Sequence, residues 1–131
     1  AYEAAFDRVV LPALDIYQPE IIIIPSGFDG GANDPLGRQM MTSEGFKSLT
    51  KKIKKSAQEI CDGKILMTHE GGYNAATVPF FAHAVIETLA GEDMNIKDPF
   101  QNIIGNMGQQ ELQPHQNNLI GEAESLLKNI K

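Results

Sequence analysis

The sequence predicts an α/β fold in which parallel strands are separated by helices. The run of four isoleucines at Ile21–Ile24 has the composition of a strand that is covered on both faces. A second apolar run, Lys64–Thr68, follows after a long segment with helical periodicity. Because a strand, a helix and a strand in this order form a right-handed crossover, we expect the two strands to be parallel and adjacent.

Composition indicates one folded domain, or a large piece of one, in a chain of 131 residues with 42% hydrophobic and 21% charged residues. A formal net charge of −6 disfavours nonspecific binding to nucleic acid or anionic lipid, and no apolar run is long enough to cross a bilayer. We therefore expect no direct nucleic acid or membrane partner.

The single cysteine, Cys61, excludes an internal disulfide and suits a reducing compartment. It lies near the end of a predicted helix, where we interpret it as a core residue. From this we expect a cytoplasmic protein, or a nuclear one if the source is eukaryotic.

The first segment, residues 2–17, has apolar residues near helical spacing, which predicts a helix. Pro12 lies inside this pattern and is expected to kink the helix or to split it in two, because proline removes a backbone donor. Pro19 should close the segment, and Pro25 should end the strand Ile21–Ile24.

The segment after residue 43 is predicted to form the crossover helix. Thr42 or Ser43 can cap its start, and Asp62 with Gly63 should end it. The apolar positions step by three or four and form one buried stripe: Phe46, Leu49, Ile53, Ala57 and Ile60. We interpret the lysines between them as a solvated helix face.

Two further helices are predicted after the second strand. The first should have Pro79 in its first turn and stop at Gly91, with Phe80, Phe81, Ala84, Val85, Thr88 and Leu89 facing inward. Residues 92–112 look irregular or short-helical. The last helix, residues 114–130, should bury one side that carries Leu119, Ile120, Ala123, Leu126, Leu127 and Ile130.

Both unusual loops, residues 26–43 and 69–76, follow the carboxyl ends of the predicted strands. In open α/β sheets, ligands bind beyond the carboxyl ends of the strands. If the strands are neighbours, Asp29 and Tyr73 can therefore face one crevice, although they lie far apart in the sequence.

The chemistry of these loops allows a structural and a functional interpretation at each position. Asp29 can be capped by backbone N–H groups or can bind a cation, but the loop fits neither a calcium EF-hand nor a Walker phosphate loop. Tyr73 can donate a hydrogen bond to a developing oxyanion or simply pack in a turn, and Gly71 and Gly72 before it permit close approach of a ligand. His69 can be a base, a ligand or a structural residue.

Several motifs occur together in one order: GFD at 27–29, DPLG at 34–37, the stretch Thr42–Phe46, and EGGY at 70–73. In this order and spacing, and with the tail 98–116, the chain resembles the C-terminal part of the catalytic domain of zinc-dependent histone deacetylases and acetylpolyamine amidohydrolases of the class II type. The resemblance implies a three-layer arginase/deacetylase-like fold, a parallel sheet flanked by helices. Residues 1–131 would be only the C-terminal portion of it, without the upstream part.

The resemblance also implies a reaction, the hydrolysis of the acetyl amide of an acetylated lysine peptide or of an acetylated amine such as an acetylpolyamine. In the family, two aspartates and one histidine hold Zn²⁺. By resemblance, Asp29 is one zinc ligand and Tyr73 is the catalytic donor to the oxyanion. Gly71 and Gly72 would line the acyl-lysine channel, and Leu36 would form part of its apolar wall.

The other two zinc ligands are expected from the missing upstream part. Family members carry an Asp-x-His pair and a His-His pair there, and this chain contains neither sequence. We therefore expect the isolated chain to be inactive and to bind zinc weakly. The alternative is a truncated, non-catalytic deacetylase-like module that acts in protein interaction. A nucleotide-binding domain is disfavoured, because no Gly-x-Gly-x-x-Gly or Walker loop follows either strand.

Overall fold

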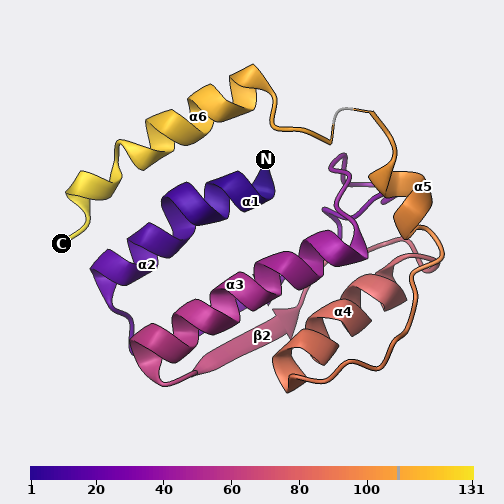
Figure 1. The fold of residues 1–131 in the computed structure, drawn as a ribbon, viewed down its shortest axis with the longest axis horizontal. Coiled ribbons are helices and arrows are strands. Elements are labelled where there is room, and N and C mark those ends of the chain that lie inside the picture. Colours follow the sequence, from indigo (N-terminus) through magenta and orange to yellow (C-terminus); the bar gives the residue numbers. More distant parts are fainter. Residues whose placement is uncertain (109) are drawn as a thin grey trace.

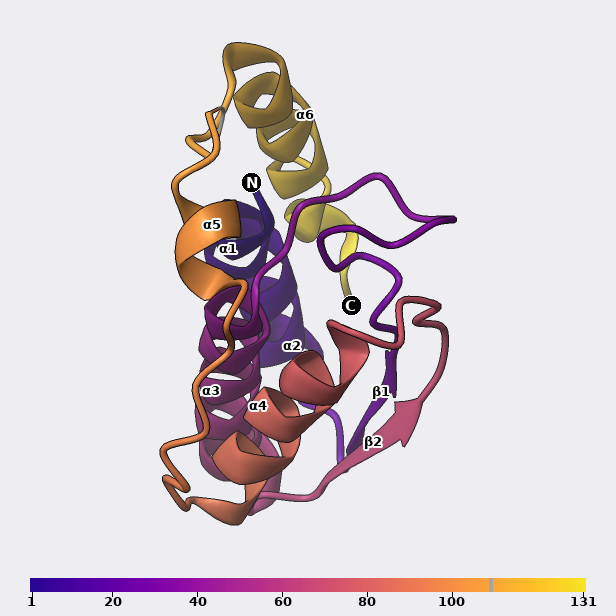
Figure 2. The ribbon, with the colours of Figure 1, turned by 90° about the vertical axis from the view of Figure 1, so that its right-hand side faces the viewer.

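The structure, a computed structural model, describes residues 1–108 and 110–131. It is an α/β arrangement in which helices pack against one face of a small parallel sheet (Figure 1 and Figure 2). The elements in chain order are α1 (Tyr2–Ala5), the π-helix η1 (Phe6–Val10), α2 (Leu11–Tyr17), β1 (Ile22–Ser26), α3 (Ser43–Cys61), β2 (Ile65–His69), α4 (Val78–Ala90), α5 (Gln101–Gly105), α6 (Pro114–Glu124) and the 3₁₀ turn η2 (Leu127–Asn129).

The predicted parallel pairing is confirmed. β1 pairs with β2 in a register that places Ile22 beside Ile65 and Ser26 beside His69. The expectation that Pro25 ends the first strand is wrong, since β1 continues to Ser26. In a parallel ladder only alternate residues bond to a given neighbour. Here the N–H of Ile22 donates toward β2, so the nitrogen of Pro25 faces away and its missing donor removes no bond of this ladder.

Helix α3 joins the two strands and packs against one face of the sheet. Its N-cap is Thr42, whose hydroxyl accepts a hydrogen bond from the N–H of Gly45 at 3.1 Å, and its end turns through Asp62 in the left-handed region at φ 53°. The buried cluster between helix and sheet consists of Ile22, Ile53, Ala57 and Cys61. The predicted stripe of α3 is thus inward, and the expectation that Cys61 is a core residue is confirmed.

The N-terminal segment is helical throughout residues 2–17, as predicted, but Pro12 neither ends nor splits it. The winding instead widens to a π-helix over Phe6–Val10, which ends two residues before Pro12. Proline lacks an N–H and its ring crowds the carbonyl four residues earlier. A wider turn at this point is one of the recognised ways to relieve that conflict.

Helix α4 lies beside α3 and completes a second apolar cluster (Figure 1). This cluster contains Phe28, Phe46, Phe81 and Val85, so it joins the first loop to both helices. As predicted, α4 carries Pro79 in its first turn and ends at Gly91, which has φ 79°.

A buried ion pair also ties α4 to α3. The ammonium of Lys47 lies 2.7 Å from Oε1 of Glu87, whose residue is only 5% exposed. The hydrogen bond from Lys47, followed by that from the N–H of Met94, lowers the pKa of the Glu87 carboxyl. The same hydrogen bond raises the pKa of Lys47, so both groups stay charged at neutral pH and the pair persists.

The C-terminal region is less regular than the sequence predicts. Residues 92–112 contain the short helix α5, as expected, although Gln109 lies outside the described residues. The last helix stops at Glu124 instead of continuing to residue 130. Its apolar residues do not form a buried side: Ile120 is buried, whereas Leu119 and Leu126 are more than half exposed. A polar contact holds the helix instead, because Arg8 donates to the Glu124 carboxylate and to Asn117.

One face of the sheet is open within the part of the chain that the structure describes. Figure 2 shows α3 and α4 on one side of β1 and β2 and no element on the other. On that side Ile23 is 59% exposed and its register partner Leu66 is 50% exposed. The run Ile21–Ile24 predicts a strand that is covered on both faces, and the described residues cover only one face.

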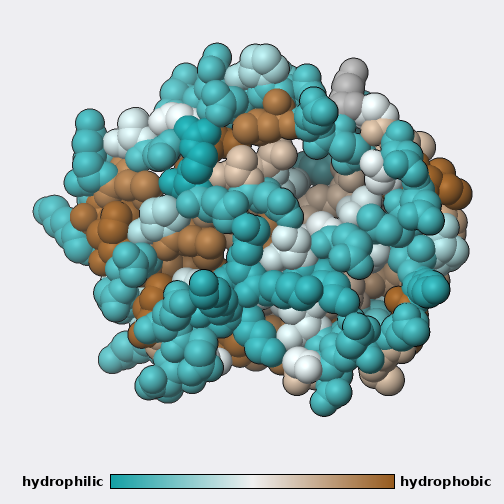
Figure 3. All heavy atoms as spheres, in the orientation of Figure 1, coloured by the Kyte–Doolittle hydropathy of each residue, from teal (hydrophilic) through white to brown (hydrophobic). Residues whose placement is uncertain are grey.

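Other apolar side chains reach the surface in smaller groups. Figure 3 shows hydrophobic areas near α2 and the C-terminal turn, separated by hydrophilic atoms. Ile16 and Tyr17 at the end of α2 are exposed, as is Leu126 directly before η2. None of the described helices combines the length and the apolarity that a membrane span requires.

The open sheet face predicts that the 131-residue chain binds a hydrophobic dye. Replacing both Ile23 and Leu66 by threonine should lower dye fluorescence, because threonine keeps the strand propensity and removes apolar surface. Met94→Thr is the matched control, since Met94 is 66% exposed but lies outside the sheet. A cooperative, monomeric melt of the unaltered chain without dye binding would contradict the prediction.

Candidate functional site

The two loops beyond the sheet start side by side because the strand pairing continues past the strands. The N–H of Glu70 donates to the carbonyl of Ser26 at 3.1 Å, and the N–H of Phe28 donates to the carbonyl of Gly71 at 2.6 Å. Asp29 thus follows directly after a residue that is bonded to the second loop. The expectation that Asp29 and Tyr73 face one crevice has its structural basis in this ladder.

Asp29 and Tyr73 converge on Gly71. A methyl group built on the Cα of Gly71 would lie 2.7 Å from Asp29 Oδ2 and 3.3 Å from the hydroxyl oxygen of Tyr73. The carboxylate and the hydroxyl therefore lie within a short distance of the same point. Any side chain at position 71 would intrude between them, so the close approach requires glycine here.

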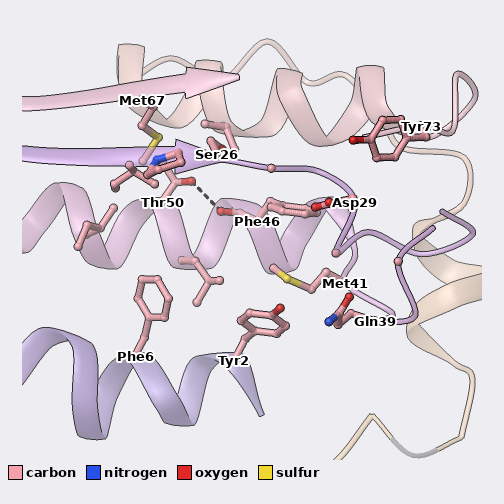
Figure 4. A pocket seen from close by; sticks show the side chains of 18 of the residues that line it. Tyr2, Phe6, Ser26, Asp29, Gln39, Met41, Phe46, Thr50, Met67 and Tyr73 are labelled. Carbon is pink, nitrogen blue, oxygen red and sulfur yellow. Dashed lines mark hydrogen bonds between the residues drawn. The ribbon is translucent and has the colours of Figure 1, made fainter. Parts of the chain in front are cut away.

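A cavity of about 570 Å³ opens beside these groups (Figure 4). Asp29, Leu36 and Tyr73 all line it, together with apolar residues of α3 and of the N-terminal helices. Leu36 is 71% exposed and Tyr73 is 56% exposed. A ligand that enters this cavity can contact an apolar wall, a carboxylate and a phenol.

The Asp29 carboxylate is available to a cation. Among the described residues no N–H or hydroxyl donates a hydrogen bond to it, so the structural cap that the sequence left open is not seen. No group of three His, Cys, Asp or Glu side chains with metal-binding geometry occurs in residues 1–108 and 110–131. Asp29 is thus a carboxylate that no described donor occupies, as a cation ligand requires.

The capped aspartate of the first loop is Asp34. Its Oδ1 accepts from the N–H groups of Leu36 at 2.8 Å and Gly37 at 2.9 Å, and its Oδ2 accepts from the N–H of Tyr73 at 2.8 Å. Desolvation raises the pKa of the Asp34 carboxyl, but the backbone donors Gly37, Tyr73 and Leu36 together outweigh it, and the pKa lies below its usual value.

A second hydrogen bond joins the same two loops at the neighbouring residues Asn33 and Asn74. The side-chain amide of Asn74 donates to the carbonyl of Asn33 at 2.7 Å, and its oxygen accepts from the N–H of Ala76. Gly72 adopts φ 141°, a conformation that strains other residues, and a Cβ there would lie 2.9 Å from the Cβ of Phe28. The backbone conformation directly before Tyr73 is therefore one that only glycine adopts without strain.

His69 is the last residue of β2 and is exposed. Its ring lies 5.2 Å from that of Phe28, centroid to centroid, and it donates and accepts no described hydrogen bond. The His69 ring thus contacts Phe28, and no described residue orients it as a base.

Sequence reasoning assigned no role to Asp34. Aspartate followed by proline is a signal for a side chain that bonds to the backbone two or three residues on, so the turn at Leu36 and Gly37 could have been predicted. The bond to Tyr73, which is 39 positions away, could not.

A carboxylate, a phenol and an apolar side chain thus line one cavity at the carboxyl edge of a parallel sheet. The family model described as the histone deacetylase domain matches residues 1–89. The chain therefore belongs to the histone deacetylase family.

Individual relatives agree with this assignment. The chain is 41% identical over 104 residues to the histone deacetylase-like amidohydrolase of Pseudomonas aeruginosa, and 39% identical over 92 residues to histone deacetylase 15 of Arabidopsis thaliana. These alignments span 79% and 70% of this chain but only 27% and 16% of the relatives.

Solved structures show the same fold. The HD domain of HDA15 superposes with a TM-score of 0.75 at 29% identity, covering 98% of this chain and 31% of that chain. The histone deacetylase Clr3 superposes with a TM-score of 0.76 at 25% identity, covering 99% of this chain and 20% of that chain. The predicted fold class is therefore confirmed, and the chain corresponds to less than a third of either chain.

The close packing of the first loop predicts that Gly37→Ala destabilises the protein. A Cβ at position 37 would lie 1.7 Å from the backbone oxygen of Asp29, so the loop must shift, at a cost of about 1–3 kcal/mol. Thermal melting of the full-length protein should show a lower Tm. Gly108→Ala is the control, because a Cβ there meets nothing within 4 Å. Equal melting of both variants would show that the loop is not packed as described.

Proposed function

We propose that the protein to which this chain belongs hydrolyses the acetyl amide of an acetylated lysine peptide, or of an acetylated amine, with the help of zinc. The observation that carries the proposal is the convergence of the Asp29 carboxylate and the Tyr73 hydroxyl on Gly71, beside an open cavity. The family assignment and the names of the relatives, which are histone deacetylases and an amidohydrolase, support it.

In this proposal Asp29 supplies one of three protein ligands of the zinc. When bound, zinc provides a Lewis acid for the acetyl carbonyl and makes a bound water more acidic. Two further ligands are expected from the upstream part of the protein. The free carboxylate of Asp29, which no described donor occupies, fits this role.

Tyr73 acts on the carbonyl oxygen of the substrate. As water adds to the carbonyl, negative charge develops on this oxygen, and the phenol donates a hydrogen bond to it. A donor that is already positioned stabilises the transition state more than the ground state, because the charge is larger there. The proton acceptor for the water is not among the residues assigned here and is expected upstream.

Leu36, Gly71 and Gly72 shape the approach of the substrate. The exposed side chain of Leu36 offers an apolar surface to the methylene chain of an acetylated lysine or amine. The two glycines let the acetyl group come close to Asp29 and Tyr73, since a side chain at position 71 would fill that space.

A second candidate function is a non-catalytic module that uses the same scaffold in protein interaction. The open sheet face with Ile23 and Leu66 favours it, as does the lack of a three-ligand metal group in the described residues. The two candidates differ in one respect: only the enzyme requires upstream zinc ligands in the same protein.

Tyr73→Phe in the full-length protein tests the enzyme directly. We expect kcat toward an acetyl-lysine peptide to fall by about 10²–10³, as for loss of one oxyanion donor, with the zinc content unchanged. Asp29→Asn should instead lower the zinc content, because a neutral amide is a poor zinc ligand. Full turnover by both variants would contradict the roles proposed for Tyr73 and Asp29, whereas no turnover by the unaltered full-length protein would favour the non-catalytic module.

The isolated 131-residue chain should hydrolyse no acetyl-lysine peptide, even with added zinc, because one carboxylate does not form a catalytic zinc site. Zinc titration should show only weak binding, which Asp29→Asn should weaken further. Robust turnover by the isolated chain would refute this expectation.

A further inference from the structure

We infer that Asp34 is a positioning residue that holds the hydroxyl of Tyr73 near the Asp29 carboxylate. This inference rests on the proposed function, in which Tyr73 donates to the oxyanion, and it assigns to the first loop a task beyond metal binding. Asp34 does not touch the cavity where the substrate would lie; it acts through the backbone of Tyr73 and of the Leu36 turn.

The two oxygens of the Asp34 carboxylate have separate partners. Oδ1 accepts from the N–H groups of Leu36 and Gly37 within its own loop, and Oδ2 accepts from the N–H of Tyr73 in the other loop. One side chain therefore fixes the apolar wall and the phenol relative to each other. The distances of 2.8–2.9 Å are those of well-formed, charge-assisted bonds.

Tyr73 depends on this anchor because its side chain has few others. The residue is 56% exposed, and its hydroxyl makes no hydrogen bond with the rest of the described chain. Gly71 and Gly72 precede it and leave the backbone flexible. The bond from the Tyr73 N–H to Asp34 therefore acts directly on the residue from which the phenol projects, whereas the neighbouring bond from Asn74 to Asn33 holds the next residue.

A carboxylate is the side chain that suits three N–H donors, since it only accepts hydrogen bonds when ionised. Its lowered pKa keeps it ionised at neutral pH. Asparagine has nearly the same shape but carries an NH₂ group on one side. Whichever way the amide turns, either Tyr73 or the Leu36 turn would face a donor instead of an acceptor.

The experiment compares Asp34→Asn, Tyr73→Phe and the double variant in the full-length protein with an acetyl-lysine peptide. Asp34→Asn should lower kcat about tenfold and change KM less than about twofold, because the phenol is displaced and not removed. In the Tyr73→Phe background the same change should alter kcat less than about twofold, since no hydroxyl remains to be positioned.

Asp93→Asn is the matched control. Asp93 also accepts from a backbone N–H two residues on, that of Asn95, but it makes no bond to the loops of the site. It should leave kcat and KM unchanged. An equal fold-loss from Asp34→Asn in both backgrounds would show a merely structural role and would overturn the inference, as would unchanged kcat in Asp34→Asn.

Amide hydrogen exchange provides a readout that does not need turnover. In Asp34→Asn, exchange at the Tyr73 amide should become faster by about tenfold, because its acceptor is lost. Unchanged exchange overturns the positioning role even if the enzyme is active. If the unaltered protein shows no deacetylation, the proposed function fails, and faster exchange still establishes that Asp34 restrains Tyr73.

Discussion

The parallel pairing of β1 with β2 is the constraint on which the rest of the structure depends. It sets the carboxyl ends of both strands at one edge, and two further backbone bonds, at Ser26 and Gly71, extend the ladder into the loops. The position of Asp29 relative to Tyr73 follows from this ladder. Helix α3 makes the pairing possible, because its buried stripe covers the sheet while it carries the chain back to the start of β2.

Ile23 and Leu66 are neighbours on the face that no described element covers. Apolar pairs of this kind normally lie inside a parallel sheet that is covered on both faces. The described residues also contain no group of three side chains that could hold a metal ion. The chain spans less than a third of the length of the relatives that it matches.

The site combines a rigid edge with loops that are held by a few specific bonds. Glycine at position 71 lets Asp29 and Tyr73 approach one point, and the Asp34 carboxylate ties the loop of one to the loop of the other. The sequence left open whether Asp29 is capped by backbone N–H groups or binds a cation. In the structure, the backbone N–H groups cap the other aspartate of this loop, Asp34. Asp34 is the capped one, and Asp29 keeps its oxygens free for a ligand.

The sequence by itself determined the alternation of strands and helices, the stripe of α3 and the presence of two polar loops after strands, since periodicity and turn residues act locally. It also carried the family resemblance. Only the tertiary structure decided that the sheet has an open face, that Pro25 stays in β1, that α6 ends at Glu124 and that Asp34 bonds to Tyr73. These features depend on which distant segments meet, and local periodicity does not contain that information.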